Sequence, residues 1–156
     1  MKIYCILALV LALSQISCLK NANTSKNINS DKTIESKSDP SFNYNPVIIG
    51  DSLVYKVDLN EAPIHIETNL EREDQFLKIE LENTKGKSIS GKISSDKMMN
   101  VRFNNILLKG KSVDGPFGKD LSCSFGDSEQ YSLVIGKSLM ADGSQIGKLS
   151  VDIIVK

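Results

Sequence analysis

Ser52-Leu-Val-Tyr-Lys-Val-Asp-Leu59 is the stretch of sequence that decides the fold class. The residues at positions 53, 55, 57 and 59 are apolar, so in an extended chain they share one face. Lys56 and Asp58 fall on the other face, where water can solvate them. This alternation predicts a half-buried β-strand.

The same period of two recurs along the rest of the chain. We expect further strands at 64–66, 77–81, 89–93, 99–103, 121–125, 131–135 and 149–155. Segments rich in Gly, Asp, Asn and Ser separate them, at 83–86, 109–110, 114–118, 126–128 and 141–144, as in β-turns. No window after Pro46 shows the apolar spacing of a helix. Residues 46–156 are therefore predicted to form one all-β domain, a single antiparallel β-sandwich of about eight short strands.

The first 17 residues have the pattern of a secretory signal peptide. One basic residue, Lys2, precedes an apolar run over 3–13 and then small and polar residues. The run is shorter than the roughly 20 residues that a membrane-spanning helix needs. The segment therefore predicts export.

Cys18 follows Ile16 and Ser17, which resembles a bacterial lipobox, although Gln15 stands where that pattern prefers Leu. The resemblance implies a lipidated Cys18 as the mature N-terminus, and Leu19 after it resembles the outer-membrane-sorted class. Cleavage after Ser14, at an A-x-S site, is the alternative. We expect an exported, lipid-anchored protein of the outer membrane or cell envelope, with its domain in the periplasm or at the cell surface.

Residues 18–45 are dominated by Asn, Ser, Lys, Thr and Asp, with too few apolar residues to offset the entropy of ordering. We expect a disordered tether about 25 to 30 Å long on average. Its Lys residues are balanced by acids, so the membrane contact is expected through the lipid alone. Three parts result: a signal peptide at 1–17, the lipidated N-terminus and tether at 18–45, and the sandwich at 46–156.

Composition limits the function classes. The chain of 156 residues has 19 basic and 19 acidic residues, no Trp, one His and three Cys. A balanced charge argues against a dedicated nucleic-acid binder. A single histidine, His65, leaves little choice for a zinc site or a Ser-His-Asp system, and it falls on the solvent face of its strand. We therefore expect no enzyme, cofactor, metal or small-molecule substrate.

Two further features of the folded part have structural interpretations. Cys123 alternates with Leu121 and Phe125, which predicts a small buried hydrophobe, or a bridge to Cys18 if that residue carries no lipid. The string 86–92 has the spacing of a phosphate-binding loop, but Ile93 replaces the Ser or Thr that would bind magnesium, and no helix signal follows. We interpret this string as a polar turn.

Phe117 lies in a turn of Gly and Pro, beside Lys119. A large apolar side chain there either tucks over the end of the core or is presented to a partner, and we favour tucking. Phe117, Lys119 and the loop residue Asp142 are our candidate partner-binding residues.

Residues 97–156 carry a family resemblance. Tyr131-Ser-Leu133, Met140-Ala141 and Leu149-Ser-Val-Asp-Ile-Ile-Val-Lys156 resemble the closing hairpin of the bacterial pre-peptidase C-terminal-like β-sandwich, and Arg102-Phe103-Asn104 is similar to its central strand. That group includes the periplasmic inhibitors of g-type lysozyme. The resemblance implies a secreted, non-catalytic domain, and no inhibitory residue is carried over.

These observations predict a non-catalytic envelope lipoprotein whose sandwich binds a macromolecular partner. Inhibition of a lysozyme is the sharpest version. The alternative is a structural or assembly lipoprotein that scaffolds other envelope proteins, for which we expect an exposed edge strand or apolar patch.

Overall fold

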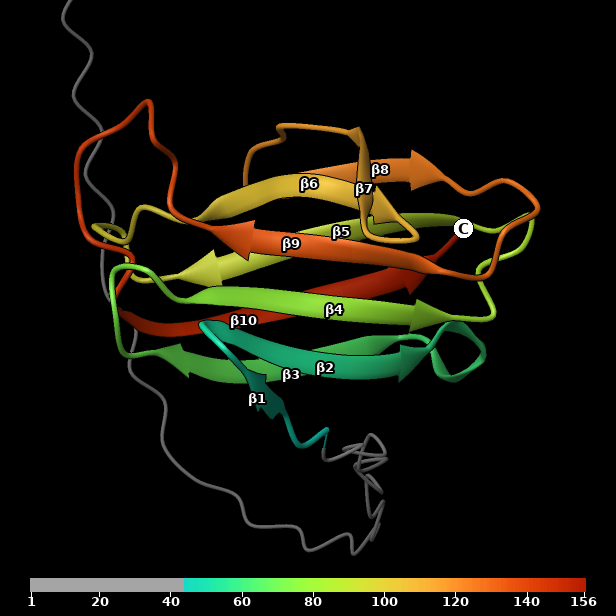
Figure 1. Ribbon diagram of the computed structural model, residues 1–156, viewed down its shortest axis with the longest axis horizontal. Coiled ribbons are helices and arrows are strands. Elements are labelled where there is room, and N and C mark those ends of the chain that lie inside the picture. The colour runs from blue at the N-terminus through green and yellow to red at the C-terminus, as the bar shows by residue number, and fades with distance from the viewer. Residues whose placement is uncertain (1–43) are drawn as a thin grey trace, which may run out of the picture. The chain divides into compact units, whose positions relative to one another are not determined.

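The computed structural model describes residues 44–156 (Figure 1). The predictions of a signal peptide, of lipidation at Cys18 and of the tether at 18–45, as far as residue 43, lie outside these residues. No helix between residues 44 and 156 is long and apolar enough to cross a membrane.

Ten strands and one short 3-10 helix follow one another along the chain. In order they are β1 (Val47–Ile49), β2 (Ser52–Asp58), η1 (Leu59–Glu61), β3 (Ile64–Leu70), β4 (Phe76–Glu82), β5 (Ser88–Ser95), β6 (Arg102–Leu108), β7 (Lys111–Asp114), β8 (Asp120–Ser124), β9 (Tyr131–Gly136) and β10 (Gly147–Val155). The expectation of an all-β domain is confirmed.

The strands form two sheets that pack face to face, as Figure 1 shows. A six-stranded sheet has the order β1-β2-β4-β9-β6-β7, and a four-stranded sheet has the order β3-β10-β5-β8. Leu77, Ile79 and Ile135 from the first sheet and Val151 and Ile153 from the second are fully buried between them. The period of two in the sequence therefore follows the inner face of each sheet.

The sandwich is not antiparallel throughout, which corrects the prediction. β2 and β4 pair in parallel, with Leu53 opposite Leu77 and Val57 opposite Leu81. The cause is the connection between them, because β3 crosses to the other sheet and β4 returns to the first one in the direction of β2. All other strand pairs are antiparallel.

The number of strands and one strand boundary also differ from the prediction. β1 and β7 were not expected, because their side chains are exposed on both faces and show no alternation. The strand expected at 99–103 begins only at Arg102. Met99 and Val101 alternate and are buried, but they lie in the loop before β6. Burial alone produced the strand-like pattern there.

Two glycines explain the string that resembles a phosphate loop. Gly86 lies in the β4–β5 turn with φ +67°, a conformation that favours glycine. Gly91 lies within β5, and a Cβ there would come within 3.1 Å of the Phe103 ring. The interpretation as a turn is therefore correct for Gly86, and Gly91 makes room for a core aromatic ring.

Candidate binding surface at the loop end

Three loops meet at one end of the sandwich, on the left in Figure 1. They are the β3–β4 loop (71–75), the β5–β6 loop (96–101) and the β9–β10 loop (137–146). We call these three segments the loop end. Specific hydrogen bonds join them, so their relative positions are determined by side chains rather than by chain connection alone.

The side chain of Asn100 joins the β5–β6 loop to the β9–β10 loop. Its Nδ2 donates to the carbonyl oxygens of Ser138 at 3.0 Å and Ala141 at 2.8 Å, and its Oδ1 accepts from the Ser138 backbone N–H at 3.3 Å. The Asn100 backbone N–H donates to the carbonyl of Ser144 at 2.8 Å. One residue thus holds both ends of the 138–144 segment.

Gln145 joins the β9–β10 loop to the β3–β4 loop. Its two Nε2 N–H groups are shared among the carbonyl oxygens of Arg72 at 3.2 Å, Glu73 at 2.7 Å and Gln75 at 2.8 Å, and the residue is only 1% exposed. Its Oε1 has no hydrogen-bond partner within residues 44–156. A buried amide that is shared among three backbone carbonyls holds the loop that surrounds it.

Glu73 adds an ion pair to this junction. Its carboxylate accepts a hydrogen bond from Lys137 Nζ at 2.8 Å and another, short one from the Ser144 hydroxyl. Hydrogen bonds from Lys137 and Ser144 hold the pKa of Glu73 below its usual value. The carboxylate is therefore ionised at neutral pH, where it binds the two ends of the β9–β10 loop.

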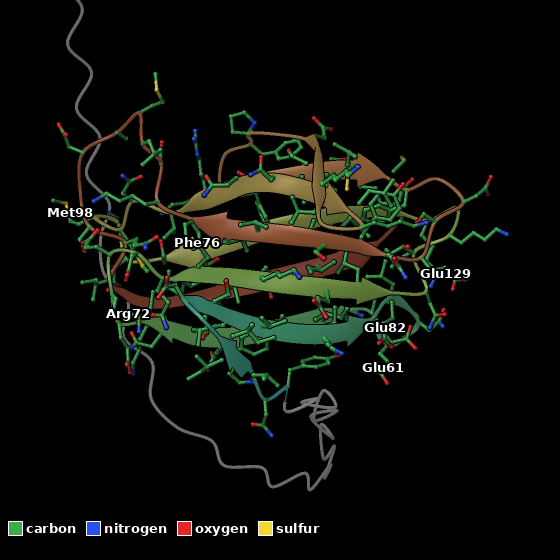
Figure 2. All side chains as sticks on the ribbon, in the orientation of Figure 1. Glu61, Arg72, Phe76, Glu82, Met98 and Glu129 are labelled. Atoms are coloured by element: carbon green, nitrogen blue, oxygen red, sulfur yellow. The ribbon has the colours of Figure 1, made fainter. Side chains whose placement is uncertain are left out.

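Long apolar side chains project from these anchored loops. Leu139 is 91% exposed, and Met98 and Met140 are each 88% exposed. Figure 2 shows Met98 at the same end of the molecule as Arg72, beyond the ends of the strands. Gly143 lets the two loops approach, because a Cβ there would meet the Met98 carbonyl at 3.3 Å. The loop end therefore presents flexible apolar groups on a backbone held in place.

The three predicted contact residues lie in two places. Asp142 is exposed in the β9–β10 loop, within the loop end. Lys119 lies immediately before β8, and its Nζ donates to Ser95 Oγ at 2.7 Å. Phe117 is partly buried and packs against the core, and its backbone N–H donates to the Phe103 carbonyl at 2.9 Å. The tucked position that we favoured for Phe117 is the one observed.

Sequence reasoning did not identify Met98, Leu139 and Met140 as candidates. A signal for them exists, because Leu139-Met140 lies within the polar stretch between Gly136 and Gly143. Only the fold shows that Met98 joins them, since 41 residues separate it from Leu139 in the sequence.

Cys123 and His65 have potentially reactive side chains, and each is explained by its contacts within the fold. Burial raises the pKa of the Cys123 thiol to about 11, so this residue is protonated at neutral pH. His65 is exposed, as predicted, and its Nδ1 donates to Asp152 Oδ1 at 2.6 Å. That hydrogen bond raises the pKa of His65. Within residues 44–156 no cluster of three or more His, Cys, Asp or Glu side chains is placed to hold a metal ion.

A second apolar surface lies at the edge of the six-stranded sheet. β1 is an edge strand, and Val47, Ile48 and Ile49 are 60%, 68% and 62% exposed. A groove of about 570 Å³ lies beside it, lined by Tyr44, Val47, Ile49, Val54, Lys56 and Glu80 among others. This is the kind of edge that the assembly alternative predicts.

Comparison with known proteins gives similarity in fold only. The sequence matches no family model and no curated protein. Among solved structures the chain is similar to PliG from Aeromonas hydrophila, a periplasmic inhibitor of g-type lysozyme, with a TM-score of 0.50 and 11% identity over 67% of this chain and 99% of that one. It is also similar to the pre-peptidase C-terminal domain of a collagenase from Bacillus anthracis, with a TM-score of 0.47 and 12% identity over 65% of this chain and 95% of that one. The two sheets and the likeness to the lysozyme inhibitor confirm the predicted β-sandwich fold.

Proposed function

We propose that the chain is a non-catalytic envelope lipoprotein that binds a protein partner through its loop end. A lysozyme, or another enzyme directed at the envelope, is the partner in the sharpest version. The observation that carries the proposal is the exposure of Met98, Leu139 and Met140 on loops that are anchored by the side chains of Asn100 and the buried Gln145. The likeness of the fold to a lysozyme inhibitor supports the choice of partner.

The free energy of burying exposed apolar groups favours a binding role for Met98, Leu139 and Met140. Water-exposed apolar groups gain about 1.5–3 kcal/mol each when a partner buries them fully. Met is enriched at protein interfaces, and its flexible thioether adapts to the surface that it meets. Anchored loops also lose little conformational entropy on binding, which leaves more of that free energy for affinity.

Charged residues lie beside the exposed apolar side chains, as in the polar rim of a protein–protein interface. Asp142 lies in the same loop, and Lys137 is paired with Glu73 beside it. Such groups contribute little net affinity but reject partners with the wrong charge pattern. Asp142 therefore keeps the role that the sequence predicted for it, while Phe117 and Lys119 remain predictions for a neighbouring contact.

The inhibitor version is tested with purified soluble chain beginning at residue 19. We expect it to lower the rate at which a g-type, c-type or i-type lysozyme clears a cell-wall suspension. Leu139→Ser is expected to weaken that inhibition by about 5–30-fold, because about 1–2 kcal/mol of apolar burial is lost. Val113→Ser, which alters a 53% exposed residue of β7, is the matched control and should leave inhibition unchanged. Unchanged rates with all three lysozyme classes would eliminate this version and leave the general binding role.

The alternative, an assembly lipoprotein, is favoured by the exposed edge strand β1. A partner strand could add there by main-chain hydrogen bonds, with its side chains in the adjacent groove. Ile48→Lys places a charge on this edge and is expected to abolish such addition while leaving the loop end intact. Loss of partner binding in Ile48→Lys, with retention in Leu139→Ser, would favour this alternative.

The lipid anchor has its own test. Mass spectrometry of the mature protein is expected to show an N-terminal Cys18 that carries acyl chains. An unmodified mature N-terminus at Gln15 would instead support cleavage after Ser14.

A further inference from the structure

The outer face of the four-stranded sheet carries a row of charged side chains. In the strand register, His65 lies opposite Asp152, Asp152 opposite Lys92, and Lys92 opposite Asp120. The four residues therefore stand side by side across β3, β10, β5 and β8. Their neighbours along each strand are buried, so these side chains face solvent. With His65 protonated, the row alternates positive, negative, positive, negative.

Half of this row has no ionic partner within residues 44–156. His65 donates to Asp152 at 2.6 Å and lies 3.5 Å from Glu67. The side chains of Lys92 and Asp120 form no ion pair in that part of the chain, although both are exposed. The row therefore retains charge that an approaching surface can neutralise.

Most of the remaining side chains on this face are short, and Glu67, Asn69 and Lys148 lie at the end of it that is formed by β3 and β10. Six serines share the face: Ser88, Ser90, Ser94, Ser122, Ser124 and Ser150. Short side chains let a second surface come close and lose little rotamer freedom when it does. Ile154, which lies opposite Ser90, leaves 51% of its surface exposed near the middle of the face. A flat, mostly polar face with one apolar residue and a charged row is suited to a weak, charge-directed contact.

We propose that this face pairs with the same face of a second copy of the chain, about a two-fold axis that runs parallel to the strands between β10 and β5. That axis reverses the order of the strands in the second copy, so β3 faces β8 of the other copy and β10 faces β5 of the other copy. His65 then faces Asp120 of the partner subunit, and Asp152 faces Lys92 of the partner subunit, each pair occurring twice. Every charge in the row meets the opposite charge.

The charge pattern selects this axis over the other one. A two-fold axis running across the strands would place Lys92 against Lys92 of the partner subunit, and His65 against His65 of the partner subunit. These like charges would repel each other. Stacked sheets rotate by about 30° relative to each other, so the central pairs align best. The Asp152–Lys92 contacts between copies therefore determine the pairing.

The size of the face predicts a weak dimer. The four strands have 5 to 9 residues, about seven on average, and lie about 4.8 Å apart, so they cover roughly 19 by 24 Å, or about 450 Å². Standard interfaces bury about 800 Å² per partner, so we expect a dissociation constant in the micromolar range at low salt, with a strong dependence on salt. This face is separate from the loop end, so the inference is independent of the proposed function.

Sedimentation equilibrium of the soluble chain from residue 19 tests the pairing. At about pH 6, below the ordinary His pKa of about 6.5, and at about 50 mM salt, we expect a reversible monomer–dimer equilibrium. Raising the salt to about 500 mM should weaken it by about 10-fold or more. A chain that stays monomeric to about 500 µM at low salt, far above a micromolar dissociation constant, would overturn the proposal.

Charge exchange makes the test specific to this geometry. Lys92→Glu should weaken dimerisation at least about 10-fold, because it sets acid against acid at both central contacts. The double variant Lys92→Glu with Asp152→Lys restores opposite charges, and should recover dimerisation to within about 3-fold. Lys111→Glu, on the exposed strand β7, is the matched control and should have no effect.

Two results of the charge exchange would also contradict the inference. One is a Lys92→Glu chain that dimerises like the unaltered one, and the other is a folded double variant that fails to recover. Circular dichroism shows whether each variant is folded. If the double variant unfolds, the pairing is tested by comparing Lys92→Glu with Lys111→Glu and by the salt dependence.

Discussion

Gln145 is expected to hold the loop end together, and its replacement should cost the domain a large share of its stability. Gln145→Leu keeps a side chain of similar length but removes the donor that serves the carbonyls of Arg72, Glu73 and Gln75. The amide has two N–H groups for these three carbonyls, and a net hydrogen bond contributes about 0.5–1.5 kcal/mol, so two predict a loss of about 1–3 kcal/mol. The variant also removes the unpartnered Oε1, which offsets part of this loss.

Urea unfolding followed by circular dichroism measures this loss. With a slope near 2 kcal/mol per molar urea, the midpoint should fall by about 0.5–1.5 M. Gln130→Leu makes the same chemical change at an exposed position between β8 and β9, and should stay within about 0.5 kcal/mol of the unaltered chain. Equal midpoints for the two variants would refute the reasoning that Gln145 anchors the loops.

Three further predictions concern other parts of the sandwich. His65→Gln should lose stability relative to the unaltered chain at acid pH only, because Asp152 raises the pKa of His65 in the folded state. The stability that His65 contributes is fully present below its ordinary pKa and is lost as the pH rises through the raised pKa. Urea midpoints at about pH 5.5 and about pH 8.5 measure the difference. Gly115→Ala should destabilise the domain by more than about 2 kcal/mol, because φ is +129° and a Cβ would lie 2.3 Å from a backbone oxygen. A Cβ at Gly118 would meet nothing closer than 4.0 Å, so Gly118→Ala should be tolerated. Thermal unfolding of both variants measures the difference. Cys123 should react with iodoacetamide at about pH 8 at least about 100-fold more slowly than in urea, since its pKa is about 11 against about 8.5 for a free thiol; equal rates would contradict its burial.

The sequence predicted the core more accurately than the sheet order. Alternating residues such as Leu77, Ile79 and Val151 are fully buried, because a half-buried strand imposes a period of two on its own residues. The parallel pairing of β2 with β4 depends on where β3 goes, and no local pattern records that path. Edge strands such as β1 escape the same test, since they have no buried face.

The candidate site shows the same limit. Asp142 was found because a polar turn residue is visible locally, and the structure does place it in the loop end. Asn100 and Gln145 were not found, because their partners lie 38 to 73 residues away in the sequence. An exposed Leu or Met in a loop resembles a core residue until the fold shows that nothing covers it.

The central claim is that the loop end contacts a protein partner, and crosslinking from single positions tests it most directly. A photoreactive amino acid is placed at Leu139, or at Val113 as control, in the full chain expressed in its own cells. We predict a discrete crosslinked protein from position 139, absent from position 113 and absent when Met98→Ser and Met140→Ser are added, because the apolar contact is then lost. No crosslink at position 139, or the same products from both positions, would contradict the claim.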